Sequence, residues 1–253
     1  MKKLLTALSC VLALTTGSAQ AQSKDWSTVR IAFDVPYEPF EYRTPDGELT
    51  GFEVDLARAV CEEIKAKCEM VVQAWDGMIP ALLARKYDAI MSSMSITEER
   101  KEKVLFSEPY YNTPGAWFVK DTSELDVNDK DAMKGKNVGV QRGTTMDSYV
   151  TENYAGVVNV KRYTTADDLA LDIGGGRLDA VFVDYPVGED ALIKKGGFKQ
   201  VGEGIKLGDG VGVAFRKRDT DLAEKFNAAL RKLKDDGTYD TIMKKYFSYD
   251  IKM

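Results

Sequence analysis

The sequence contains no histidine among its 253 residues. This absence excludes a Ser-His-Asp triad, a Cys-His pair and a metal site built on imidazole. Cysteine is scarce as well, with three residues in the whole chain, too few for a thiolate cluster. Any catalytic function would therefore depend on carboxylate, lysine, tyrosine or arginine side chains. We expect neither a bound metal nor a cofactor.

Long apolar runs are missing beyond the first residues of the chain. Two lysines precede an apolar run over residues 4–14, and Ala19-Gln20-Ala21 fits the A-x-A cleavage pattern. This order predicts a signal peptide over residues 1–21 and an exported mature chain. The run is too short to cross a bilayer, and no later run approaches that length. A lipoprotein is the alternative, but it would need Cys10 at the end of a run that continues through Leu14.

The chain carries no excess of positive charge. Subtracting Lys2 and Lys3 of the signal peptide from the 35 basic residues leaves 33, against 40 acidic ones, so the mature net charge is −7. A nucleic-acid-binding protein is expected to show a basic stripe, so nucleic acid is not an expected partner. The balance suits a soluble secreted protein.

Two cysteines are left after removal of the signal peptide, Cys61 and Cys68. In an exported chain an even pair is most simply a disulfide. The loop between them is short, so its closure would stabilise the fold by about 2–3 kcal/mol. Two buried free thiols are the alternative.

Predicted strands and helices alternate along the chain and form two α/β units of similar size. This alternation favours a parallel sheet with right-handed crossovers in each unit. The first unit comprises a strand over 28–35, a helix over 53–65, a strand over 68–73, a helix over 76–86 capped by Asp76, and a strand over 87–93. The second comprises strands over 136–141, 158–163, 177–184 and 198–203, with helices over 143–154, 165–176 and 185–197. A strand over 210–217 and two amphipathic helices over 219–247 complete the chain.

Polar residues follow several of these strands at the point where each strand ends. In open α/β sheets, ligands bind beyond the carboxyl ends of the strands. Each residue alone is a weak signal, because aspartates and serines also serve as turn residues and local caps there. The residues concerned are Asp34, Ser92 and Ser93 in the first unit, and Thr144, Thr145 and Asp184 in the second.

Taken together, these residues fit a free amino acid, which carries a carboxylate and an ammonium on one carbon. Arg100 can bind the carboxylate through two parallel hydrogen bonds, and the backbone N–H groups of Thr144 and Thr145 at a helix start add to it. Asp184 can hold the ammonium with help from Ser93. The alternative for Arg100 is a surface position on a short helix that Thr97 caps, beside two glutamates.

Aromatic residues in the first unit predict the environment of the ligand side chain. Tyr37 and Trp75 lie in loops after the first two strands and can enclose an aliphatic or planar cationic group. Asp34 would lie near the far end of that group and favour a positive charge. Alternatively, Trp75 fills the core and Tyr37 packs on the neighbouring prolines.

Nearly all of the mature chain resembles the periplasmic solute-binding proteins of bacterial ABC importers for polar amino acids, especially the lysine/arginine/ornithine and histidine binders. The motifs that carry the resemblance are "GFEVDLARAVCEE", "WDGMIPAL", "YDAIMSSMSITEER" and "GRLDAVFVD", and less specifically "VGVQRGTT". The resemblance implies a two-lobed periplasmic binding protein fold of type II, with the ligand cleft between lobes that close about a hinge. Residues 22–112 and 203–253 would form lobe 1, and residues 113–202 lobe 2.

The resemblance also implies a role for each site residue. The ligand carboxylate falls to Arg100, Thr144 and Thr145, the ammonium to Ser93 and Asp184, and a cationic side chain to Asp34, Ser92 and Ser95 between Tyr37 and Trp75. Cys61 and Cys68 match a disulfide of the family. Two positions depart from the lysine/arginine/ornithine type, which tends to have Leu in place of Gln141 and Gln in place of Met146. Gln141 could accept a further hydrogen bond from a guanidinium, which favours arginine.

The resemblance implies a periplasmic, monomeric protein that binds a free cationic amino acid and delivers it to an ABC transporter permease in the inner membrane. Arginine is favoured over lysine, ornithine and histidine, and an opine is an alternative ligand. An enzyme similar to the periplasmic cyclohexadienyl or arogenate dehydratases is the rival function on this fold. A cleft lined by Asp34 and Asp184 would repel the dicarboxylate substrate of such an enzyme. A binding protein that serves a chemoreceptor is a further alternative.

Overall fold

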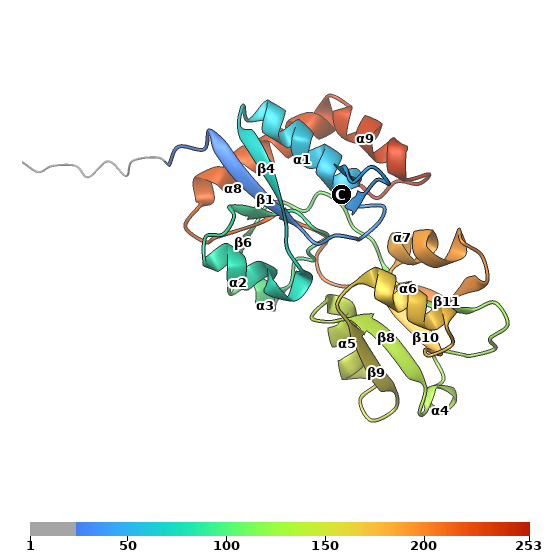
Figure 1. Cartoon of the computed structure of the whole chain (residues 1–253). Coiled ribbons are helices and arrows are strands. Elements are labelled where there is room, and N and C mark those ends of the chain that lie inside the picture. Colours follow the sequence, from blue (N-terminus) through green and yellow to red (C-terminus); the bar gives the residue numbers. More distant parts are fainter. Residues whose placement is uncertain (1–23) are drawn as a thin grey trace, which may run out of the picture.

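The structure, a computed structural model, describes residues 24–253, so the expected signal peptide over 1–21 lies outside the described residues. Two lobes, each with its own five-stranded sheet, are visible in Figure 1. Helices α1, α8 and α9 belong to one lobe, and α5 and α6 to the other. The predicted α/β fold with two units is confirmed.

The sheet of the first lobe is mainly parallel at one side and antiparallel at the other. Strand β1 runs parallel to β4 and β5, whereas β12 runs antiparallel to both β5 and β6. In spatial order the strands are β4 (Lys67–Val72), β1 (Thr28–Phe33), β5 (Ala89–Ile90), β12 (Ala214–Phe215) and β6 (Leu105–Phe106). The helices are α1 (Phe52–Glu63), α2 (Met78–Leu83), α3 (Glu98–Lys101), α8 (Thr220–Asp235) and α9 (Thr238–Tyr246), with the 3₁₀ helix η1 (Trp75–Gly77) before α2 and a small hairpin of β2 (Tyr42–Arg43) and β3 (Leu49–Thr50).

Both faces of this sheet are buried, as the apolar sequence of β1 requires. Ile31 and Phe33 point to the face that α1 and α8 cover, whereas Ala32 points to the opposite face, packed against α2. The predicted helix over 76–86 is shorter than expected. Gly77 precedes α2 as its N-cap, and Asp76 belongs to η1, so the prediction of Asp76 as the cap was wrong.

The second lobe repeats this design with other strands. Strands β8, β9 and β10 are parallel, whereas β7 runs antiparallel to β10 and β11. In spatial order the strands are β11 (Phe198–Ile205), β7 (Gly115–Lys120), β10 (Ala180–Asp184), β8 (Asn137–Gln141) and β9 (Asn159–Tyr163). The helices are α4 (Lys130–Met133), α5 (Thr145–Asn153), α6 (Ala166–Gly174) and α7 (Tyr185–Gly188), followed by the π-helix η2 (Glu189–Ile193).

The chain crosses between the two sheets twice, and the two crossings lie side by side. The first leads into β7 and the second leaves β11, where Ile205 pairs with Gly115. Tyr111, which precedes the first crossing, forms a bridge with Val211, which follows the second. The exact division of the chain into lobes at 113 and 203 stays a prediction.

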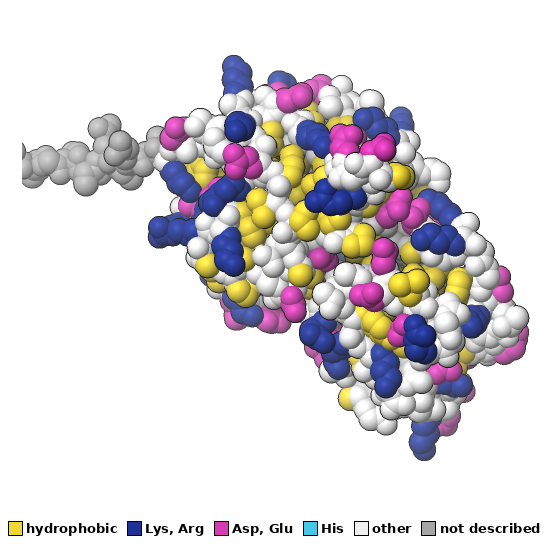
Figure 2. Space-filling view, viewed as in Figure 1, with side chains coloured by type: hydrophobic (Ala, Val, Ile, Leu, Met, Phe, Trp, Pro, Cys, Tyr) yellow, Lys and Arg dark blue, Asp and Glu magenta, His cyan; other side chains and the backbone are white. Residues whose placement is uncertain are grey.

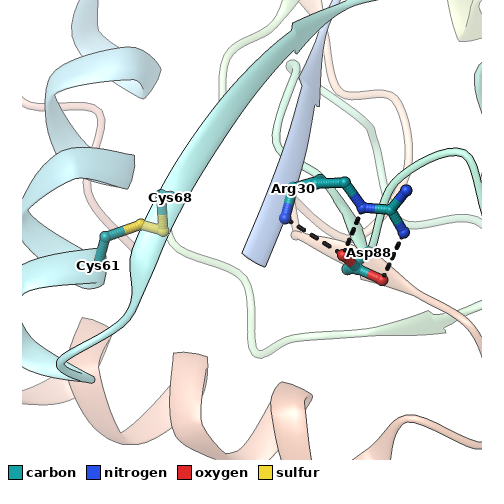
Figure 3. The surroundings of a disulfide bond; sticks show 4 residues. All are labelled: Arg30, Cys61, Cys68 and Asp88. Atoms are coloured by element: carbon teal, nitrogen blue, oxygen red, sulfur yellow. Dashed lines mark hydrogen bonds and ion pairs between the residues drawn. A yellow bond between two sulfur atoms is a disulfide. The ribbon is translucent and has the colours of Figure 1, made fainter. Parts of the chain in front are cut away.

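A disulfide and a charged cluster lie at the end of the first sheet where strand β1 begins (Figure 3). Cys61 on α1 and Cys68 on β4 are bonded, as predicted, so the alternative of two free thiols was wrong. Asp88 accepts hydrogen bonds from Arg30 Nε at 3.0 Å and Arg216 Nη2 at 2.8 Å. Burial alone would raise the pKa of Asp88, but these two guanidinium groups outweigh it and lower the pKa to about 2.

Charged side chains of both signs are interspersed over the face of the molecule shown in Figure 2. Within residues 24–253, no helix has the length and apolar character needed to span a membrane. The same residues contain no cluster of three or more carboxylate or cysteine side chains arranged to hold a metal ion.

Candidate functional site

All of the predicted ligand-binding residues line one cavity between the lobes. From the first lobe come Asp34, Tyr37, Trp75, Ser92, Ser93, Ser95 and Arg100, and from the second Gln141, Thr144, Thr145 and Asp184. Two further residues, Glu41 and Met146, also line it.

The carboxyl ends of the parallel strands bring these residues together. Asp34 directly follows β1, and Ser92 comes two residues after β5. On the opposite wall, Gln141 and Asp184 are the last residues of β8 and β10. Each lobe therefore presents the strand ends at which the sequence predicted the site.

Arg100 lies on the short helix α3, whose N-cap Thr97 accepts a hydrogen bond from the Arg100 backbone N–H. The guanidinium turns back into the cavity wall, where Nη1 donates to the Ser95 carbonyl at 2.9 Å. It also lies 5.2 Å from the centre of the Trp75 ring. Burial lowers the pKa of Arg100 to about 10, so the side chain is still positively charged at neutral pH.

Asp184 faces the cavity from the second lobe and is held by donors from elsewhere in the chain. The Tyr37 hydroxyl donates to its Oδ2 at 2.5 Å, and the Thr113 hydroxyl donates to its Oδ1 at 3.1 Å. Burial raises the pKa of Asp184 to about 7, and these hydrogen bonds and the charge of Arg100 oppose that rise. A positively charged partner would therefore strongly stabilise the ionised form of Asp184.

Asp34 lies opposite Gln141, whose Nε2 donates to Asp34 Oδ2 at 2.7 Å across the cleft. The Asp34 backbone N–H donates to the Ser92 hydroxyl at 2.8 Å. Burial raises the pKa of Asp34 to about 6, against the effect of the Gln141 hydrogen bond. Like Asp184, this carboxylate is partly desolvated, so a positively charged group beside it would stabilise its ionised form.

The aromatic and hydroxyl residues join the two walls at the mouth of the cavity. Trp75 is half-buried, and its Nε1 donates to the Gly143 carbonyl of the second lobe at 3.0 Å. The Ser95 and Thr145 hydroxyls lie 3.3 Å apart. Thr144 caps α5, accepting a hydrogen bond from the Asp147 backbone N–H at 3.2 Å. Trp75 packs against the core of the first lobe but stays half-buried and lines the cavity, so it does not fill the core.

Glu41 was not among the predicted site residues, yet it is fully buried and lines the cavity. The surrounding segment was predicted as a loop, with two prolines and an Asp46-Gly47 turn, and nothing in that pattern marks one of its residues as buried. Two backbone hydrogen bonds, one of them from Glu53 N–H to the Phe40 carbonyl at 3.0 Å, instead hold the loop against the start of α1. Gly51 permits this approach, because its φ is +124° and a Cβ there would lie 2.2 Å from the Phe40 carbonyl oxygen.

Ser92 and Ser93 connect the cavity wall to two buried glutamates. The Ser92 hydroxyl donates to Glu41 Oε1 at 2.5 Å. Ser93 donates to Glu53 Oε2 from its backbone N–H at 2.6 Å and from its hydroxyl at 3.0 Å. Ser93 has a positive φ of 49°, an unfavourable conformation for a residue with a side chain, and this contact helps to hold it.

The cavity wall therefore carries three carboxyl groups and one guanidinium. A ligand complementary to this wall has one anionic group and more than one cationic group. Two lobes that enclose such a cavity between their strand ends define a two-lobed binding protein.

Sequence and structure comparisons identify the family. The family model for bacterial extracellular solute-binding proteins, family 3, matches residues 29–249, and the chain belongs to this family. The L-arginine-binding protein of Pseudomonas aeruginosa is 44% identical over 259 residues, covering 99% of this chain and 98% of that protein.

Two solved structures resemble the whole described fold. An ancestral arginine-binding protein bound to arginine superposes with a TM-score of 0.82 at 37% identity, covering 88% of this chain and 99% of that one. An ancestral amino acid-binding protein described as a precursor of cyclohexadienyl dehydratase has a TM-score of 0.80 at 33% identity, covering 88% of this chain and 96% of that one.

Proposed function

We propose that this protein binds one molecule of arginine between its lobes and delivers it to an ABC importer from the periplasm. The observation that carries this proposal is the charge pattern of the cavity, with Arg100 on one wall and Asp34, Glu41 and Asp184 around it. Arginine brings one carboxylate and two cationic groups, which matches that pattern. The arginine binders among the related proteins support the same ligand.

The ligand's α-carboxylate binds Arg100 and the backbone N–H groups at the start of α5, and its α-ammonium binds Asp184. The guanidinium extends between Tyr37 and Trp75 toward Asp34. A planar guanidinium presents five N–H donors in a fixed fork, whereas a lysine ammonium is a point charge with three donors. Gln141, which already contacts Asp34, places a further acceptor near the guanidinium. These features favour arginine over lysine and ornithine.

Ligand binding stabilises the closed arrangement of the lobes. Arg100 lies in the first lobe and Asp184 in the second, so one amino acid links both and shifts the population toward closure. The closed form is the one that the permease binds, and the protein acts as a monomer.

A dehydratase is the second candidate function, because one of the structurally similar proteins is a precursor of cyclohexadienyl dehydratase. The carboxylates of this cavity argue against it, since prephenate carries two carboxylates of its own. Incubation of the purified protein with prephenate and arogenate tests this candidate directly, and turnover of either would refute a pure binding role.

A thermal-shift panel tests the proposed ligand. The panel contains arginine, lysine, ornithine, histidine, glutamine and citrulline, together with an arginine-derived opine. A ligand at 100 times its dissociation constant adds about 2.7 kcal/mol to the free energy of unfolding. We expect the largest shift with arginine. A panel in which no cationic amino acid raises the melting temperature would overturn the proposal.

A further inference from the structure

One buried polar atom in the cavity wall has no hydrogen-bond donor. Glu41 Oε1 accepts from Ser92, but no donor reaches Oε2, and it is the only such buried side-chain atom within residues 24–253. A buried carboxylate oxygen without a donor is unfavourable, because its lost hydration is not replaced. The Glu41 carboxyl therefore needs either a proton or a cation.

Glu53 is the group beside Glu41 that can accept such a proton. The two carboxyl groups are within hydrogen-bond reach of each other, and a bond between two carboxyls exists only if one of them is protonated. Glu53 already accepts from the Tyr110 hydroxyl and from Ser93. Since both oxygens of Glu53 have donors and Oε2 of Glu41 has none, the proton belongs on Glu41 Oε2.

The surroundings of the pair reinforce this assignment. Burial raises the pKa of both glutamates, and the charge of Glu53 raises that of Glu41 further. Apart from Arg100 across the cavity, the neighbouring titratable groups are acids or phenols. They are Asp34 after β1, Tyr37 in the following loop, Tyr110 and Tyr111 after β6, and Asp184 at the end of β10.

We propose that the protein exchanges a proton for its ligand: Glu41 holds a proton and donates it to Glu53, and the cationic end of the ligand takes the place of that proton. The O–H bond of Glu41 breaks, the proton passes to the solvent, and the guanidinium donates to the Glu41 carboxylate. Glu41 and Asp34 together form a two-carboxylate subsite for the cation. This inference rests on the proposed binding of a cationic amino acid.

The exchange keeps the charge of the buried cavity constant. Arginine adds one net positive charge, and the departing proton removes one. A neutral ligand of the same shape has no cation to offer, so the Glu41 proton stays. Citrulline, in which an uncharged ureido group replaces the guanidinium, is that ligand.

Isothermal titration calorimetry in two buffers with different ionisation enthalpies, near neutral pH, measures the number of protons released. Asp184 binds the α-ammonium of both ligands, so any proton that it releases cancels in the difference between arginine and citrulline. For the wild-type protein we expect arginine to release about one proton more than citrulline. A difference of zero would overturn the inference without any variant.

Two substitutions separate Glu41 from Asp34 as the source of the proton. In Glu41→Gln the extra release disappears, and the preference for arginine over citrulline falls by about tenfold or more. In Glu53→Gln the new amide supplies the missing donor to Glu41, so the release disappears while arginine binding is retained. Glu48→Gln, on the exposed hairpin, is the matched control and leaves both quantities unchanged.

The outcomes separate this inference from the proposed function. If the wild-type protein does not bind arginine, the proposed function fails. If it binds arginine with no extra proton, or if the release persists in Glu41→Gln, only the inference fails. Melting temperatures of all variants verify that they are folded.

Discussion

The sequence left a surface position open as an alternative for Arg100, whereas in the structure its side chain lines the cavity. Its helix is only one turn long, and the guanidinium is held by the Ser95 carbonyl and the Trp75 ring rather than by the adjacent glutamates. We predict that Arg100→Ala weakens arginine binding by about 2–5 kcal/mol, because a buried ligand carboxylate loses its partner.

Calorimetry with arginine measures the effect of Arg100→Ala. Arg43→Ala, on the exposed β2–β3 hairpin, removes the same charge away from the cavity and serves as the control. A loss smaller than about threefold in Arg100→Ala would contradict the proposed contact with the carboxylate.

Asp34 permits a narrower prediction about selectivity. Asparagine retains the size of the side chain and a hydrogen-bonding oxygen for Gln141, but it removes the negative charge. Asp34→Asn should therefore weaken arginine binding roughly 10–100-fold, the value of a hydrogen bond to a charged group. Citrulline binding should change little. Competition titrations with both ligands measure this, and equal losses for the two would contradict the assignment.

The sequence could predict most of the cavity residues because each follows a recognisable strand. Asp34, Ser92 and Asp184 were found in this way. Glu41 could not be found, because its loop is irregular and its burial depends on a close backbone approach at Gly51. The contact between Gln141 and Asp34 was also missed, since it exists only once the two lobes face each other.

At the scale of elements, the disulfide ties α1 to β4 at the end of the sheet away from the cavity. Cys68 pairs in register with Val29 near the start of β1, whereas Asp34 follows the opposite end of that strand. Replacing both cysteines by serine should lower the free energy of unfolding by about 2–3 kcal/mol, because the unfolded chain gains freedom. Urea unfolding measures the loss.

The ligand affinity of the double serine variant should stay close to that of the wild type, since the first sheet separates the disulfide from the cleft. A large loss of affinity with unchanged stability would show that the disulfide acts on the site and not on the fold. Thermal shifts with saturating arginine supply the comparison.

Elements with strong periodicity were predicted well, and short ones were not. The α1 helix and the β1 strand agree closely with the predicted ranges. The predicted strand over 87–93 retains only Ala89–Ile90 as regular strand, because the chain turns at Ser93 to reach Glu53. The helix expected over 185–197 divides into α7 and a π-helical turn. In both places tertiary contacts override the local pattern.

The whole molecule combines two sheets through two adjacent crossings, and it concentrates acidic groups where the lobes meet. Asp34 and Asp184 have pKa values of about 6 and about 7 in the folded protein, above their ordinary value of 3.8. The folded protein therefore binds more protons than the unfolded chain between about pH 4 and pH 7. Its free energy of unfolding should consequently fall as the pH rises through this window.

This prediction is tested by melting curves without ligand across that pH range. We expect a loss of at least about 1 kcal/mol between the acidic and the neutral end, equivalent to roughly 2–4 °C in Tm. The opposite trend begins only below the window, where protonation of Asp88 removes its ion pairs with Arg30 and Arg216.

Saturating arginine should flatten the dependence, because its cationic groups favour the ionised carboxylates. The double variant Asp34→Asn/Asp184→Asn should weaken it without any ligand, and the part due to the buried Glu41 should remain. A wild-type protein whose stability rises steadily from pH 4 to pH 7 would show that these carboxylates are solvated or already paired in the folded state. The cavity would then have no electrostatic preference for a cation, and the choice of a cationic ligand depends on that preference.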